Sequence, residues 1–232
     1  MKKYIPNLLT ICNLLCGSVA VLSAYNADYT VTVILVLAAA VFDFLDGFAA
    51  RLLKAYSPIG KELDSLADMI SFGLAPAVVA CTLLKASGLQ EFAYVGLLIA
   101  AFSALRLAKF NIDERQTSSF IGLPTPANAI FWVGLAYPYN QSIGNCQCVT
   151  IGLTGLILLS CFLLVCNLPM YSLKFKSFNA KENFWQILLV AHSIMFLILL
   201  QVRALPTIIL FYVVTSIIKM AGDKRKFSHN KK

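Results

Sequence analysis

Long apolar runs follow one another along this chain, and they constrain its fold more than any other feature. They lie near residues 5–24, 30–53, 60–84, 90–108, 125–138, 148–166, 184–201 and 205–221. Most approach the ~20 residues with which a helix crosses a bilayer, and the run 125–138 is the shortest. Only 13% of the residues are charged, against about 25% in soluble domains, so lipid must surround most of the chain. We therefore predict an all-α polytopic membrane bundle with about eight transmembrane helices.

Turn-forming residues separate these runs, as at residues 26–28, Ser57-Pro58 and residues 167–169. No long linker or repeat interrupts them, so residues 1–222 are predicted to form one integral membrane domain, followed by a basic tail at 223–232. The first run follows two lysines, as in a signal peptide. No A-x-A cleavage site comes after it, so we expect this run to remain in the mature protein.

The basic residues predict an orientation in the membrane. When the N-terminus is placed in the cytoplasm and the runs alternate, every lysine and arginine except Lys85 and Arg203 falls on the cytoplasmic side. This bias follows the positive-inside rule, so both termini are predicted to be cytoplasmic. The net charge of +8 is thereby explained by orientation and by contact of the tail with anionic headgroups, and no nucleic acid is needed.

The cysteines and histidines give weaker signals. Most of the seven cysteines lie inside apolar runs, where cysteine behaves as a small hydrophobe. Cys146 and Cys148 are one residue apart with no second Cys or His pair nearby, which favours an inert role over a metal or redox pair. His192 is expected to be a packed residue of the seventh run, and His229 a solvated residue of the tail.

Four aspartates interrupt the second and third runs: Asp43, Asp46, Asp64 and Asp68. A carboxylate inside a membrane helix costs a few kcal/mol, so four together need a compensating partner. On helices, the first two lie about 60° apart and the last two about 40° apart, and the short connection makes the helices antiparallel neighbours. Carboxylates without His or Cys select Mg²⁺ or Mn²⁺, and two such ions are suited to phosphoryl transfer.

The residues beside the acids favour a phosphate ligand. Gly47 and Ala50 leave room on the acidic face, and Arg51 offers planar donors to a phosphate. Gly60 permits close approach near the start of the third run, where helix amides favour anions. The alternatives are the ion path of a secondary transporter and an inert polar cluster in a structural membrane protein. The clustering of Gly, Ala and Arg with the acids favours phosphate chemistry.

The segment 43–68 reads D-x2-D-G-x2-A-R-x8-G-x3-D-x3-D, and with this signature the chain resembles the CDP-alcohol phosphatidyltransferase family. The resemblance implies a six-helix core, here extended to eight helices. It also implies two ions of Mg²⁺ or Mn²⁺ held by the four aspartates, with Asp68 as the general base. The residues expected to bind the CDP-lipid are Asn7, Thr10, Gly47, Ala50, Arg51, Ser57 and Gly60.

Four further segments resemble the bacterial type II phosphatidylserine synthases. They are residues 6–17 (PNLLT and CNLLCG), 71–77 (SFGLAPA), 104–111 (ALRLAKFN) and 122–127 (GLPTPA). This resemblance implies transfer of a phosphatidyl group from CDP-diacylglycerol to L-serine, with phosphatidylserine and CMP as products. It also implies a bacterial cytoplasmic (inner) membrane with the active site on the cytoplasmic side, and it includes a homodimer among the expected assemblies.

Three polar residues are candidates for binding the acceptor alcohol. A guanidinium can hold a carboxylate by two hydrogen bonds, so Arg106 is the candidate for binding the carboxylate of serine, with Asn111 and Thr125 as further polar contacts. The alternative role of Arg106 is that of an anchor at the membrane edge. Glycerol 3-phosphate, inositol phosphate and choline remain alternative acceptors, because the aspartate signature does not separate them.

Overall fold

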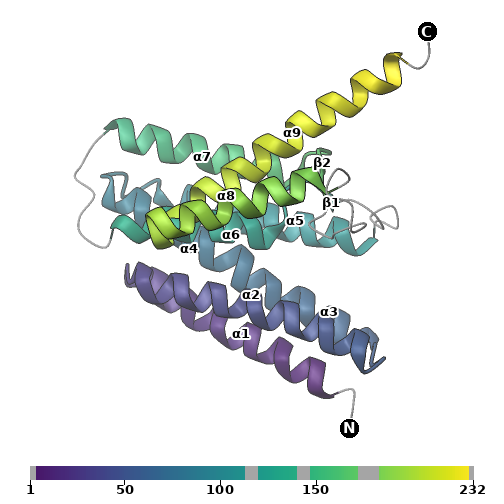
Figure 1. The fold of residues 1–232 in the computed structure, drawn as a ribbon. Helices are drawn as coiled ribbons and strands as arrows, with labels where there is room; N and C mark the ends of the chain where they lie inside the picture. The colour runs from purple at the N-terminus through teal and green to yellow at the C-terminus, as the bar shows by residue number, and fades with distance from the viewer. Residues whose placement is uncertain (1–3, 113–119, 140–146, 172–182, 230–232) are drawn as a thin grey trace.

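The computed structural model describes residues 4–112, 120–139, 147–171 and 183–229 (Figure 1). Within these ranges the chain is almost entirely helical. Its α-helices are α1 (Tyr4–Tyr25), α2 (Tyr29–Leu52), α3 (Pro58–Asp68), α4 (Ala75–Ala86), α5 (Leu98–Ile112), α6 (Thr125–Ala136), α7 (Gln147–Val165), α8 (Phe184–Leu200) and α9 (Leu205–His229). A π-helical segment, Met69–Leu74, joins α3 to α4, and short 3₁₀ segments span Ala93–Leu97, Tyr137–Tyr139 and Gln201–Ala204. The strands β1 (Phe120–Ile121) and β2 (Pro169–Met170) form one short antiparallel pair.

Six stretches of the described chain are long and apolar enough to cross a membrane: Tyr4–Tyr25, Tyr29–Leu52, Pro58–Ala86, Ala93–Ile112, Gln147–Val165 and Phe184–Ala221. They confirm the predicted all-α polytopic membrane bundle. Each of the eight expected runs is helical, but two details differ from a simple row of spans. Helix α6 has 12 residues, which extend about 18 Å and are too short to cross alone. The stretch Phe184–Ala221 contains both α8 and α9, which pack against each other and are separated by a break at Gln201, where φ is 52°.

Tight turns connect the first three helices. Ala27 adopts a left-handed conformation after α1, and the side chain of Asp28 then accepts a hydrogen bond from the amide of Val31 at 3.1 Å. Lys54 adopts the same conformation after α2. Such caps are worth about 1 kcal/mol each and end a helix sharply. Helix α1 packs against both α2 and α3, and Figure 1 shows the three helices in one layer. The predicted pairing of α2 with α3 is therefore indirect, because α1 rather than a backbone contact between them holds the two acidic helices together.

Small and polar residues form the buried stripe of α1. The buried positions recur every three or four residues and are Pro6, Thr10, Asn13, Gly17, Ala20 and Ala24. Small side chains let helix backbones approach closely in a membrane. At Gly17 the approach is so close that a Cβ would lie 2.1 Å from the Oγ of Ser71. Through this stripe, α1 packs directly against the segment Met69–Leu74 that follows α3.

Helix α4 connects this layer to the rest of the bundle. It contacts α1 as well as α6 and α7, and in Figure 1 it passes from the layer of α1–α3 towards the layer of α5–α9. Phe72, just before α4, and Trp132 on α6 are fully buried in the same core. The indole of Trp132 donates a hydrogen bond to Ser160 on α7 at 3.1 Å. The two layers thus share one hydrophobic core.

The minor predictions can also be placed. His192 packs between the rings of Phe196 and Phe211, with ring centroids 4.3 and 3.9 Å away, as expected for a packed histidine. The six cysteines among the described residues are all free, and Cys146 lies outside the described residues. The backbone of α9 continues to His229, but the side chains of the predicted tail at 223–232 are outside the described part of the structure.

Candidate active site

Three carboxylates from α2 and α3 meet in the space between these helices, both of which pack against α1. Asp43 comes from α2, while Asp64 and Asp68 lie one turn apart on α3; each offers an oxygen within 4.8 Å of the other two. All three side chains are half-buried. The fourth predicted ligand, Asp46, is buried and is not part of this close group. Its Oδ2 accepts a hydrogen bond from the hydroxyl of Thr10 on α1 at 2.6 Å.

The donor set fits a divalent cation. The Oδ1 atom of Asp64 is buried and has no hydrogen-bond partner among the described residues. A buried carboxylate oxygen without a donor is costly, and three carboxylates this close repel one another. A cation bound between them would remove both penalties. Oxygen ligands of this kind, with no His or Cys in the group, suit Mg²⁺ or Mn²⁺.

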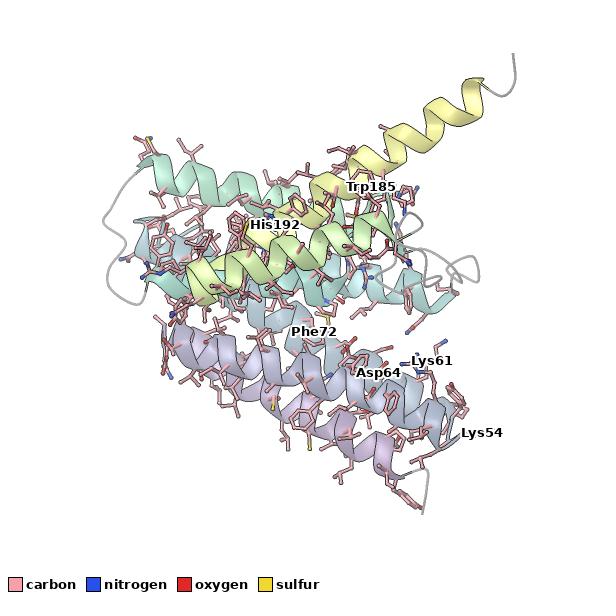
Figure 2. All side chains as sticks on the ribbon, in the orientation of Figure 1. Lys54, Lys61, Asp64, Phe72, Trp185 and His192 are labelled. Atoms are coloured by element: carbon pink, nitrogen blue, oxygen red, sulfur yellow. The ribbon has the colours of Figure 1, made fainter. Side chains whose placement is uncertain are left out.

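A cavity of about 340 Å³ opens beside the carboxylates. Its walls come from the start of α1, the end of α2, the connection between α2 and α3, and the start of α3. The lining residues are Pro6, Asn7, Thr10, Asp46, Gly47, Ala50, Arg51, Ala55, Tyr56, Ser57, Gly60, Lys61 and Asp64. All seven residues predicted to bind the CDP-lipid are among them. Figure 2 shows Lys61 and Asp64 at this end of α3, with Lys54 beyond the end of α2.

The two predicted glycines of the cavity, Gly47 and Gly60, differ in whether protein packing requires a glycine. A Cβ at Gly47 would meet no atom within 4 Å, so protein packing does not require glycine there. Gly47 lines the cavity, so this space is available to a ligand. A Cβ at Gly60 would lie 2.9 Å from the Oγ of Ser57 and 3.0 Å from Oδ1 of Asn7. The glycine at position 60 therefore lets α3 approach α1 closely.

Two polar side chains on the cavity wall, those of Ser57 and Arg51, form hydrogen bonds within the protein. The Oγ of Ser57 accepts a hydrogen bond from the amide of Gly60 at 3.1 Å and so caps α3, with Pro58 at the first helical position. The Nε of Arg51 donates to the carbonyl of Gly47 at 2.9 Å. This bond leaves the outer guanidinium nitrogens of an exposed side chain beside the cavity. Arginine is well suited to hold a phosphate from such a position.

The predicted acceptor residues lie on α5 and α6. Arg106 is only 7% exposed, which argues against an anchor at the membrane edge, because an anchor would extend its charge to the interface. Its Nη1 donates to the Oγ1 of Thr125 at 3.2 Å, while its Nε has no hydrogen-bond partner among the described residues. Asn111 lies apart from this pair and donates from Nδ2 to the Oγ of Ser65 on α3 at 2.9 Å. The structure thus brings Arg106 and Thr125 together and ties Asn111 to the helix that carries two of the acids.

One residue at the site was missed in the prediction. Asn13 on α1 is fully buried, and its Nδ2 donates to Oδ1 of Asp68 at 3.2 Å. A signal for it was present in the sequence. Asn7, Thr10 and Asn13 recur every third residue on a run that is otherwise mostly apolar, a spacing that places polar groups along one side of a helix.

Fold and site together define a class: a polytopic membrane protein with an acidic cluster between two helices and an adjoining polar cavity lined by three. A family model described as CDP-alcohol phosphatidyltransferase matches residues 3–166, which is most of the chain. The chain belongs to the CDP-alcohol phosphatidyltransferase family. The resemblance stated from the signature is thereby confirmed.

Curated relatives are similar over long parts of the chain. The CDP-diacylglycerol–serine O-phosphatidyltransferase of Bacillus subtilis is 37% identical over 151 residues, covering 62% of this chain and 83% of the relative. The enzyme of the same name from Helicobacter pylori strain 26695 is 32% identical over 238 residues, covering 97% and 94%. The archaetidylserine synthase of Methanothermobacter thermautotrophicus is 37% identical over 132 residues, covering 54% of each chain.

Proposed function

We propose that this protein transfers the phosphatidyl group of CDP-diacylglycerol to the hydroxyl of L-serine, forming phosphatidylserine and CMP. The observation that carries the proposal is the convergence of three carboxylates within 4.8 Å beside a cavity of about 340 Å³. That cavity is lined by the signature residues expected to hold a CDP-lipid. The names of the relatives from Bacillus subtilis and Helicobacter pylori support serine as the acceptor.

The carboxylates are assigned to divalent metal. Asp43, Asp64 and Asp68 would hold one ion of Mg²⁺ or Mn²⁺ in their close group, and Asp46 would join them in holding a second. Bound ions neutralise a diphosphate and polarise its bridging bond. Asp46 already accepts a hydrogen bond from Thr10, so α1 orients this carboxylate towards the cavity that it lines.

The cavity is assigned to the nucleotide end of the CDP-lipid. The open space at Gly47 and Ala50 would admit the diphosphate close to the backbone of α2, and Arg51 would donate to a phosphate oxygen. Ser57 and Gly60 at the start of α3, with Asn7 and Thr10 on α1, would form the remaining walls. The acyl chains would reach lipid between the helices, because the exposed faces of α1 and α2 carry large apolar side chains.

The reaction is proposed as a direct displacement. Asp68 would accept the proton of the serine hydroxyl, and the resulting alkoxide oxygen would form a new bond to the phosphorus that carries diacylglycerol. The bond from that phosphorus to the bridging oxygen would break, and the bridging oxygen would leave with CMP. No covalent intermediate is proposed, and the close acidic group of Asp43, Asp64 and Asp68 contains no Cys or His.

Arg106 and Thr125 are proposed to recognise serine. The guanidinium of Arg106 is buried, and its Nε lacks a partner among the described residues. A buried donor of this kind is costly unless a ligand satisfies it, and the carboxylate of serine is a suitable acceptor. Thr125, which already contacts Nη1, would orient the guanidinium. Asn111, at the end of α5, would supply a further polar contact to the acceptor.

The placement in the membrane is also a proposal. Both ends of the described chain lie on the side of the bundle where α2 turns into α3 (Figure 1). This supports a common face for the termini and the site, and the basic residues predict that this face is cytoplasmic. We propose residues 1–222 as one domain of a bacterial cytoplasmic membrane protein. A homodimer is proposed from the family resemblance, and the mass of the purified protein–detergent complex tests it.

The decisive experiment measures CMP release from CDP-diacylglycerol by the purified protein. With Mg²⁺ or Mn²⁺ present, CMP release should require L-serine, and glycerol 3-phosphate, inositol phosphate or choline should not substitute for it. Release with one of those acceptors in place of serine would reassign the substrate. Absence of release with every acceptor, combined with passage of labelled solute into liposomes, would favour a secondary transporter instead.

A further inference from the structure

A buried amide, that of Asn13, contacts the proposed base. We propose that Asn13 is a positioning residue for Asp68 and that Ser71 in turn fixes the orientation of Asn13. The proposal rests on the proposed role of Asp68 as base and metal ligand. It assigns to α1 a part in the chemistry although α1 supplies none of the four aspartates.

The contacts fix which way the amide faces. Nδ2 of Asn13 donates to Oδ1 of Asp68 at 3.2 Å, and Oδ1 of Asn13 accepts from the hydroxyl of Ser71 at 2.7 Å. With the amide turned over, its oxygen would face the carboxylate oxygen, and two acceptors would repel each other. Because Asn13 and Ser71 are both 0% exposed, water does not compete for these bonds. One oxygen of Asp68 is thereby engaged by Asn13, which restricts the rotation of the carboxylate.

The backbone holds Ser71 in place for this role. Ser71 lies in the π-helical segment Met69–Leu74, which begins directly after Asp68, and π-helical turns are frequent at functional sites. Its hydroxyl also lies 3.0 Å from the backbone carbonyl of Asn13. The contact between Gly17 and Ser71 leaves no space for a Cβ at position 17. Asn13, Gly17 and Ser71 therefore form a closely packed group beside Asp68, and none of them lines the cavity.

A positioning role and a merely structural role predict different measurements. Residues that orient a ligand from behind typically change metal affinity or activity by 10–100-fold when they are removed. A structural contact would change only the stability of the protein. Asn13→Ala is therefore compared with Ser18→Ala, a control on the same helix whose hydroxyl donates to the carbonyl of Leu14 at an exposed position.

Two readouts are measured on the purified full-length protein: steady-state kinetics of CMP release, and Mn²⁺ affinity by electron paramagnetic resonance without substrates. Asn13→Ala should lower kcat and weaken Mn²⁺ binding by about 10–100-fold, with the KM for CDP-diacylglycerol and for serine within twofold of wild type. Ser18→Ala should match wild type in both. In an Asp68→Asn background, Asn13→Ala should cause no further loss of Mn²⁺ affinity, because the two residues act as one unit.

Unchanged kcat and Mn²⁺ affinity in Asn13→Ala, or an equal loss of affinity with and without Asp68, would overturn the proposal. Should Asn13→Ala not be recovered from the membrane, Ser71→Ala is measured instead; a loss in both readouts supports the proposal, and wild-type values overturn it. The failure of the proposed function is recognised separately. If wild-type protein releases no CMP while Asn13 and Asp68 are coupled in Mn²⁺ binding, the positioning role is supported and the proposed transfer activity is rejected.

Discussion

Replacing Gly47 by alanine should separate activity from stability. The added Cβ would meet no protein atom within 4 Å, so no clash is expected in the free protein. Gly47 lies inside α2, where alanine is favoured over glycine by about 0.5–1 kcal/mol. The variant should therefore be as stable as wild type or slightly more stable. The methyl group would, however, extend into the cavity proposed to bind the diphosphate.

The magnitude of the activity loss follows from overpacking. An extra carbon in a fitted site costs about 1–3 kcal/mol, which corresponds to about a 5- to 150-fold fall in kcat/KM for CDP-diacylglycerol. Gly155→Ala on α7 is the matched control, because a Cβ there also meets nothing within 4 Å, and the residue does not line the cavity. The assay is CMP release at varied CDP-diacylglycerol, with thermal unfolding in detergent measured on the same samples. Wild-type kcat/KM in Gly47→Ala would refute the assignment of this space to the substrate.

Four further predictions address other parts of the site. Asp68→Asn should abolish CMP release while the protein remains folded in the membrane, and near wild-type turnover would exclude Asp68 as the base. Arg106→Ala should raise the KM for serine more than the KM for CDP-diacylglycerol in steady-state kinetics; an unchanged serine KM would contradict its proposed contact with the acceptor carboxylate. Gly17→Ala should lower the stability of the protein in thermal unfolding. The added Cβ would clash with Ser71 at a cost of about 1–3 kcal/mol, which outweighs the gain of about 0.5–1 kcal/mol from replacing glycine by alanine in a helix. Equal or greater stability would show that the helices can move apart. Removal of divalent metal with EDTA should stop CMP release, and Mn²⁺ at one hundred times its Kd should stabilise the protein by about 2.7 kcal/mol against unfolding; activity that persists after metal removal would reject the metal site.

The architecture and much of the cavity could be predicted because their signals are local. Apolar runs define helices that can cross a bilayer, and cap residues such as Asp28 and Ser57 mark where helices begin. The spacing of Asp64 and Asp68 places both on one side of α3 whatever the helix packs against. The family signature adds the residues from Gly47 to Gly60, and the structure places all the predicted CDP-lipid residues on one cavity.

Contacts between distant segments were beyond the reach of such signals. The prediction treated the four aspartates as one group, whereas the structure gathers three of them and pairs Asp46 with Thr10, which lies 36 residues earlier in the chain. It offered two roles for Arg106, and only the packed bundle shows this side chain to be buried beside Thr125. Both results depend on how one helix is rotated and shifted against another.

What the sequence by itself determined is a membrane bundle of apolar helices, the acidic positions on two of them, and a family signature, since each rests on residue type and spacing within one segment. What only the tertiary structure decided is which groups meet across helices. Asn13 and Asp68 are 55 residues apart, and their hydrogen bond exists because Gly17 lets α1 approach Ser71 closely. Such a contact depends on the distance and rotation between packed helices, and these are set by the side chains of the whole bundle together.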